Sequence, residues 1–184
     1  MSLLVCLAIA LAITTPVYAQ TATRSGKLNR EEFRTRLSTV RDEKKKAIVD
    51  RTDKRIVEIN ANRTSIMTRH LTKIEETLNK IETRALEVEK KGKDISAVRA
   101  AIATARTAIA SAKAAIATQA AKTYTIDVTT EDKLGLAVSS TRTAFAKDLQ
   151  AAHQSVVTAR KSVRDVLTAL AKVVGEKLPD AIEK

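Results

Sequence analysis

The chain has 184 residues, a formal net charge of +12, and only four glycines and two prolines. So few helix-breaking residues, with 2% aromatic residues and no tryptophan, exclude a sheet-rich fold and favour long helices. We therefore expect an all-α protein, an elongated three-helix coiled-coil bundle over residues 29–178.

Residues 1–19 have the pattern of a secretory signal peptide. The apolar run Leu3–Ile13 is followed by Pro16 and by residues 17–19, Val-Tyr-Ala, which resemble a cleavage site. A run of this length is too short to span a bilayer. We expect export to the periplasm, cell envelope or extracellular space, and leave open whether the segment is cleaved. Cys6, the single cysteine, lies in this segment, so the mature chain has no thiol for a disulfide or a metal.

Residues 20–28 are small and polar and predict a flexible leader, after which a first helix is expected over residues 29–91. Asn29 and Glu32 have the spacing of a capping box at its start. Gly92 is a typical residue to follow its end.

The apolar pattern of this first helix changes along its length. From Met67 to Val88 the apolar residues alternate by four and three, which predicts the seam of a coiled coil. Between about residues 44 and 65 the seam weakens to Ile48, Ile56 and Ile59. Two interpretations stay open there, a stutter in the repeat and an exposed section without a continuous partner.

A second helix is expected over residues 94–122, because residues 101–121 are three tandem heptads that each begin Ala-Ile-Ala. Alanine also fills the outer positions, so we expect other helices to contact this helix on two sides. Its predicted seam consists of Val98, Ile102, Ala105, Ile109, Ala112, Ile116 and Gln119.

Residues 123–129 change to a period of two, which is typical of an extended segment. Such a segment either lies along the helices as a connector or pairs its edge with another chain, so an oligomer contact through it stays open. A third helix is expected over residues 130–175, ended by Gly175. Residues 179–184 are expected to form a frayed tail.

The basic residues suggest the kind of partner. Between Arg24 and Arg55 they outnumber the acidic ones, and a chain of this charge favours acidic surfaces, polymers or partners. A solvated charged surface is the alternative explanation. The predicted contact residues are Arg34, Arg36, Arg41, Lys44, Lys45, Lys46, Arg51, Lys54 and Arg55.

No catalytic motif is present in the sequence, so we expect no enzymatic activity, no cofactor and no catalytic residue. His70 and His153 are the only histidines, and two histidines without a carboxylate partner make a poor zinc site, so we expect no metal. We also expect no nucleic-acid partner, because the mature chain has few aromatic residues for base stacking. A membrane surface stays open as a partner.

The stretch "AAKTYTIDVTTED" at residues 120–132, after the alanine-rich helix, resembles a set of uncharacterised exported helical proteins of candidate-phylum bacteria. That resemblance covers most of the mature chain and implies an envelope or extracellular location, but no activity. A looser likeness is to small basic periplasmic coiled-coil chaperones. Those proteins trimerise through a β-rich body, whereas this chain has one candidate strand.

We therefore expect a non-catalytic exported protein that binds an acidic surface, polymer or partner, or serves as a structural envelope component. One alternative is a periplasmic holdase for unfolded clients. A second is a self-assembling envelope or filament component.

Overall fold

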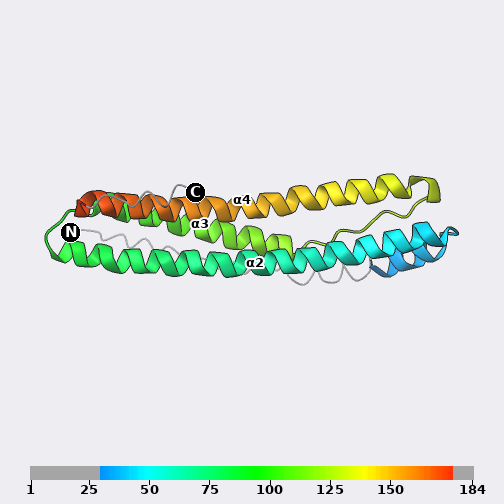
Figure 1. Ribbon diagram of the computed structural model, residues 1–184, viewed down its shortest axis with the longest axis horizontal. Helices are drawn as coiled ribbons and strands as arrows, with labels where there is room; N and C mark the ends of the chain where they lie inside the picture. The colour runs from blue at the N-terminus through cyan, green and yellow to red at the C-terminus, as the bar shows by residue number, and fades with distance from the viewer. Residues whose placement is uncertain (1–29, 176–184) are drawn as a thin grey trace, which may run out of the picture.

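The computed structural model of the protein describes residues 30–175, which confirm the prediction of an all-helical chain (Figure 1). These residues contain no strand. A short helix over residues 30–38 precedes α2 (Glu43–Lys90), α3 (Ser96–Ala121), a 3-10 turn η1 (Glu131–Lys133) and α4 (Leu134–Val174). The predicted signal peptide, the leader and the tail at 179–184 lie outside the described residues.

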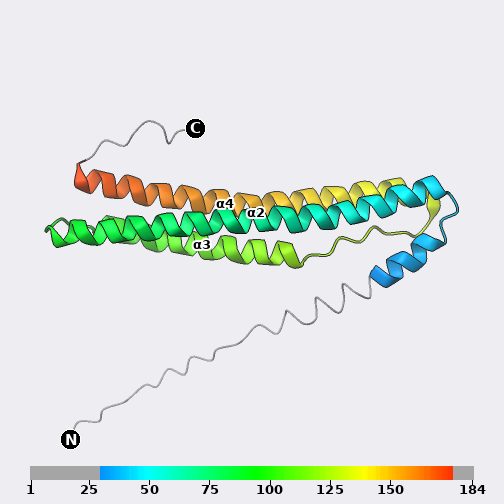
Figure 2. The ribbon, with the colours of Figure 1, turned by 60° about the horizontal axis from the view of Figure 1, so that its bottom comes forward.

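The three long helices lie side by side, and α3 covers only part of the length of α2 and α4 (Figures 1 and 2). The chain between α3 and η1 continues in the same direction as α3, towards the start of α4. Two apolar clusters result, one along α3 and one beyond its end. None of the described helices is both long enough and apolar enough to cross a membrane.

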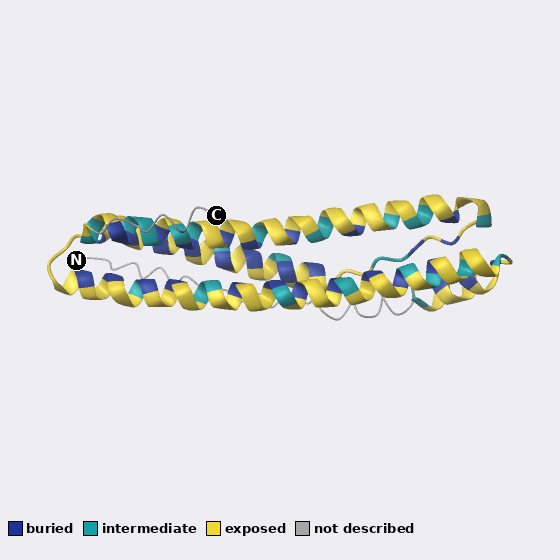
Figure 3. Cartoon of the chain, in the orientation of Figure 1, coloured by how far each residue is buried: buried dark blue, intermediate teal, exposed yellow. Residues whose placement is uncertain are grey.

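The larger cluster joins α2, α3 and α4, and α3 contributes every residue of its predicted seam to the buried side. Its isoleucines alternate with alanines, which lets neighbouring helices approach closely. As expected, two helices, α2 and α4, contact α3, but its outer alanines, such as Ala103, Ala110 and Ala117, are exposed. One face of α3, coloured as buried in Figure 3, packs on α2 and α4, and its opposite face of small residues is exposed.

The weak section of the α2 seam is a continuous buried stripe in which polar residues take core positions. Asp53, Asn60 and Thr64 are buried together with Val49 and Ile56. The spacing 53, 56, 60, 64 and 67 contains two consecutive steps of four, which is the signature of a stutter.

The prediction that Ile48, near the start of α2, belongs to the seam was wrong. Ile48 is 55% exposed, and its neighbour Val49 is the buried residue.

The first predicted helix, over residues 29–91, is not continuous. It breaks at residues 39–42, so that helix 30–38 folds back beside the start of α2 (Figure 2). The hydroxyls of Ser38 and Thr39 donate to the carbonyls of Thr35 and Arg36 at 2.6 and 2.7 Å. Asp42 then caps α2 by accepting from the backbone N–H groups of residues 44 and 45 at 2.9 and 3.2 Å.

This reversal builds the second apolar cluster. Phe33 and Leu37 of helix 30–38 pack with Val49 of α2 and with Ile126 and Val128 of the segment after α3. Ile126 is 1% exposed, whereas Asp127 and Thr129 are exposed, as a period of two requires. Beyond the end of α3, helix 30–38 and this extended segment therefore cover the inner faces of α2 and α4.

The last long helix begins later than predicted. Residues 131–133 form η1, and α4 starts at Leu134. The side chain of Thr130, the residue before η1, forms no capping hydrogen bond. Glu131 instead accepts from the backbone N–H of Asp42 at 3.2 Å, which ties this turn to the turn before α2. Gly175 ends α4 in the left-handed conformation, at φ +83°.

Candidate functional site

The nine predicted contact residues are spread over helix 30–38, the turn after it and the first turns of α2. Eight of them are exposed and Lys46 is half-buried. Four of the nine have acidic partners within 4 Å, namely Arg36, Lys45, Lys46 and Lys54.

Because of these ion pairs, only some of the nine predicted cations are without an acidic neighbour among the described residues. Arg36 pairs with Glu32 at 2.5 Å and with Asp127 at 3.6 Å, and Lys54 pairs with Asp50 at 2.7 Å. Exposed pairs of this kind add little stability, but they do reduce the positive potential of the surface that carries them. The structure therefore does not bring all nine residues together as one uncompensated surface.

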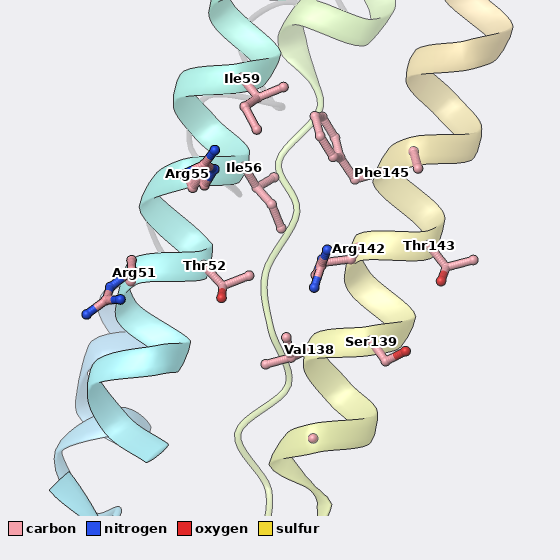
Figure 4. A pocket seen from close by; sticks show the side chains of 12 residues that line it. Arg51, Thr52, Arg55, Ile56, Ile59, Val138, Ser139, Arg142, Thr143 and Phe145 are labelled. Carbon is pink, nitrogen blue, oxygen red and sulfur yellow. The ribbon is translucent and has the colours of Figure 1, made fainter. Parts of the chain in front are cut away.

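An open hollow of about 830 Å³ between α2 and α4 is lined by cations from both helices (Figure 4). Arg51 and Arg55 of α2 line it from one side, and Arg142 of α4 lines it from the other. All three side chains are exposed and form no ion pair with any residue of 30–175. We call this space, defined by its lining residues, the wide hollow.

Apolar side chains line the inner part of the wide hollow. Ile56 and Ile59 project from α2, and Val138 and Phe145 from α4 (Figure 4). No carboxylate lines it. Glu58 is the nearby acidic residue, since it lines a shallow depression on the outer side of α2 together with Arg51 and Arg55. The wide hollow thus combines an apolar floor with a cationic rim.

A second hollow, of about 240 Å³, lies further along the same two helices, and we call it the narrow hollow. Its rim carries Lys73 of α2 with Arg160 and Arg164 of α4, again without a carboxylate. Its apolar lining consists of Ile74, Ile81, Val163 and Leu167.

Both hollows lie on the side of the α2–α4 pair that faces away from α3. The α3 side of α2 is marked by Glu75, which holds Lys113 of α3 at 2.8 Å, and by Glu82 and Glu89. Lys73 and Thr77, which line the narrow hollow, lie on the opposite flank of the same turns because residues follow one another by 100°. Glu75, Glu82 and Glu89 of α2 thus pair with cations of α3, whereas Lys73 lies on the other flank.

On α4, too, an acidic residue faces α3 and the basic residues lie on the opposite flank. Asp148 faces the end of α3, where it accepts from Lys122 at 2.7 Å. Arg142, Arg160 and Arg164 lie on the other flank, towards the two hollows.

Sequence reasoning missed these three arginines because it considered the cations of the first helix alone. Two of them, Arg160 and Arg164, directly follow buried residues of α4, Ala159 and Val163.

The end of α3 is held by a polar junction. The side chain of Asn60 donates to the carbonyl of Gln119 at 3.0 Å, and the amide of Gln119 donates back to Asn60 at 2.9 Å. Tyr124 donates to Asp148 at 2.8 Å and packs its ring edge-on against Phe145. Burial raises the pKa of Tyr124 to about 12, and hydrogen bonds from Lys122 and Tyr124 lower the pKa of Asp148.

This junction has the character of a structural contact. Its polar atoms satisfy one another, and no buried side-chain polar atom of the described residues lacks a partner. The carbonyl of Gln119 at the end of α3 accepts from the backbone N–H of Lys122 at 3.2 Å and also from the side chain of Asn60.

No group of three or more histidine, cysteine, aspartate or glutamate side chains within residues 30–175 is placed to hold a metal ion. His70 and His153 are both exposed.

Comparison of the chain with family models, with curated proteins and with solved structures gives no match.

Proposed function

We propose that this protein is an exported, non-catalytic binding protein that contacts an acidic partner through Arg51, Arg55 and Arg142. The scaffold we propose for this work is an elongated three-helix coiled-coil bundle with an extended connector at about residues 123–129. The observation that carries the proposal is the wide hollow, where these three arginines share one opening and have no acidic partner among the described residues.

Arginine is the cation best suited to this role. Its planar guanidinium binds carboxylates and phosphates through two parallel hydrogen bonds. A cation without a partner needs no ion pair to be broken before it binds, unlike Arg36 or Lys54. The net charge of +12 also speeds the approach of acidic partners at low salt.

Export is proposed from residues 1–19, whose apolar run and small residues at 17 and 19 suit a signal peptide. The location would be the periplasm, cell envelope or extracellular space. The absence of cysteine from residues 20–184 suits an oxidising compartment, because no thiol is then open to oxidation.

The test is the binding of heparin and of polyglutamate over a range of salt concentrations. Replacing Arg51, Arg55 and Arg142 together by glutamine should weaken binding and flatten its dependence on salt. The matched control replaces Lys80, Lys161 and Lys172 by glutamine. These are three exposed cations outside both hollows, so the control changes the net charge by the same amount as the test variant. Equal losses in the two triple variants, or binding that ignores salt, would contradict the proposal.

A holdase chaperone is the second candidate, favoured by the apolar floor of the wide hollow. A holdase should suppress aggregation of a denatured client at a near-equimolar ratio. Replacing Ile59 by aspartate, which puts a charge on that half-buried floor, should abolish this effect if the floor holds clients.

A further inference from the structure

We propose that the groove between α2 and α4, on the side away from α3, is the docking site for an amphipathic helix with acidic flanks, supplied by a partner protein. This inference deepens the proposed function, on which it rests, by naming the form of the partner. By the groove we mean the flank of α2 and α4 that carries the wide and the narrow hollow, which are separated by residues 60–72 of α2 and 147–159 of α4.

The apolar floor of the groove favours an amphipathic partner over a simple polyanion. Ile59, Ile74 and Leu167 are half-buried, so each has apolar surface left to cover. A polysaccharide or another hydrophilic polyanion gains nothing from that surface. An apolar stripe on a helix would remove it from water, at about 25 cal/mol per Å².

Charge complementarity sets the flanks of the partner. Arg55 and Lys73 stand on the α2 rim, and Arg142, Arg160 and Arg164 stand on the α4 rim. With cations on both rims and no carboxylate lining either hollow, the groove fits a helix that carries acidic residues on both sides of its apolar stripe.

The length of the groove favours a helix over a compact anion. The two hollows extend from residue 51 to residue 81 of α2, which is about 45 Å at 1.5 Å per residue. A single headgroup or phosphate would reach one hollow and leave the other empty. A helix of about 30 residues would contact both, in the way that a fourth helix completes a bundle.

The test uses the full chain and a synthetic 28-residue peptide as the probe. The peptide carries leucine and alanine at alternating steps of three and four, glutamate beside that stripe and glutamine elsewhere. A first comparison peptide has the same composition in an order that destroys the stripe, and a second has lysine in place of glutamate. We expect the acidic amphipathic peptide to bind at least tenfold more tightly than the permuted peptide and to become more helical on binding. The lysine peptide should not bind.

Variants at the narrow hollow then locate the site. Replacing Arg160 and Arg164 by glutamate should lower the affinity for the acidic peptide at least tenfold. Replacing them by glutamine should lower this affinity less. The matched control, Lys80→Glu with Lys161→Glu, changes the net charge equally and should leave most of the peptide affinity. Thermal melts of each variant separate loss of binding from loss of folding.

Three results would overturn the inference. If heparin binds but the amphipathic peptide binds no better than its permuted form, the groove does not select a helix and the proposed function survives alone. If neither binds, both proposals fail. If vesicles of anionic phosphatidylglycerol bind in its place and the peptide does not compete, the partner is a membrane surface.

Discussion

At the scale of single residues, the most informative feature is that polar side chains take core positions in α2. Asp53 is 7% exposed and lies in the same buried stripe as Val49 and Ile56. Burial raises the pKa of its carboxyl group, and Arg30, at 3.9 Å, offsets this only in part. A search for apolar residues alone could not find this stripe, because three of its members are polar.

Asp53 leads to a pH-dependent prediction. A carboxyl group whose pKa is raised by folding stabilises the fold when protonated, and that stabilisation is lost as the pH rises through the folded pKa. At pH 7 the ionised group therefore carries a net penalty, and Asp53→Asn should raise the free energy of unfolding. At pH 3, where the group is protonated in both states, the substitution should have little effect.

Denaturant unfolding at the two pH values measures this difference. Asp165→Asn is the control, since Asp165 is an exposed residue of α4, and this substitution should not stabilise the protein. A loss of stability in Asp53→Asn at pH 7 would mean that the attraction to Arg30 exceeds the cost of burial.

At the scale of elements, α3 and α2 differ in how far their buried faces were predictable. All seven predicted seam residues of α3 are buried, because its heptads are regular and nothing else competes for the inner positions. In α2 the repeat contains a stutter near Asn60, where α3 ends and its last residues need polar partners. The apolar pattern alone therefore placed Ile48 in the seam in error.

Two isoleucine substitutions test this contrast. Ile109→Ala in α3 removes a side chain that is 3% exposed, and it should cost about 2–5 kcal/mol in the free energy of unfolding. Ile48→Ala removes a predicted seam residue that lies on the surface, and it should change stability by less than about 0.5 kcal/mol. Equal losses, measured by denaturant unfolding, would show that Ile48 is buried in solution.

At the scale of the whole molecule, two apolar clusters hold the helices together, and the second depends on the short helix 30–38. Phe33 and Leu37 are the side chains of that helix that cover Ile126 and Val128. Without them, the extended segment would keep little of its buried surface, and its backbone has no strand partner in the described chain.

This dependence predicts a local effect of Phe33→Ala. Amide hydrogen exchange should become faster at residues 122–130 and in the first turns of α2 and α4, because the second cluster opens more readily. Exchange in the part of α3 around Ile109, which belongs to the other cluster, should change much less. Uniform acceleration along the whole chain would show instead that the two clusters unfold as one unit.

The sequence by itself determined the helical class, the seam of α3, the glycine at the end of α4 and the alternation at residues 123–129. These features are local, because the spacing of apolar side chains along the chain determines which face of an element is buried. Only the tertiary structure decided what covers each face. It folded helix 30–38 back to form the second cluster, and it left the α2–α4 flank away from α3 uncovered. For that reason Arg142 lines the wide hollow together with Arg51 and Arg55, although nearly ninety residues of chain separate it from them.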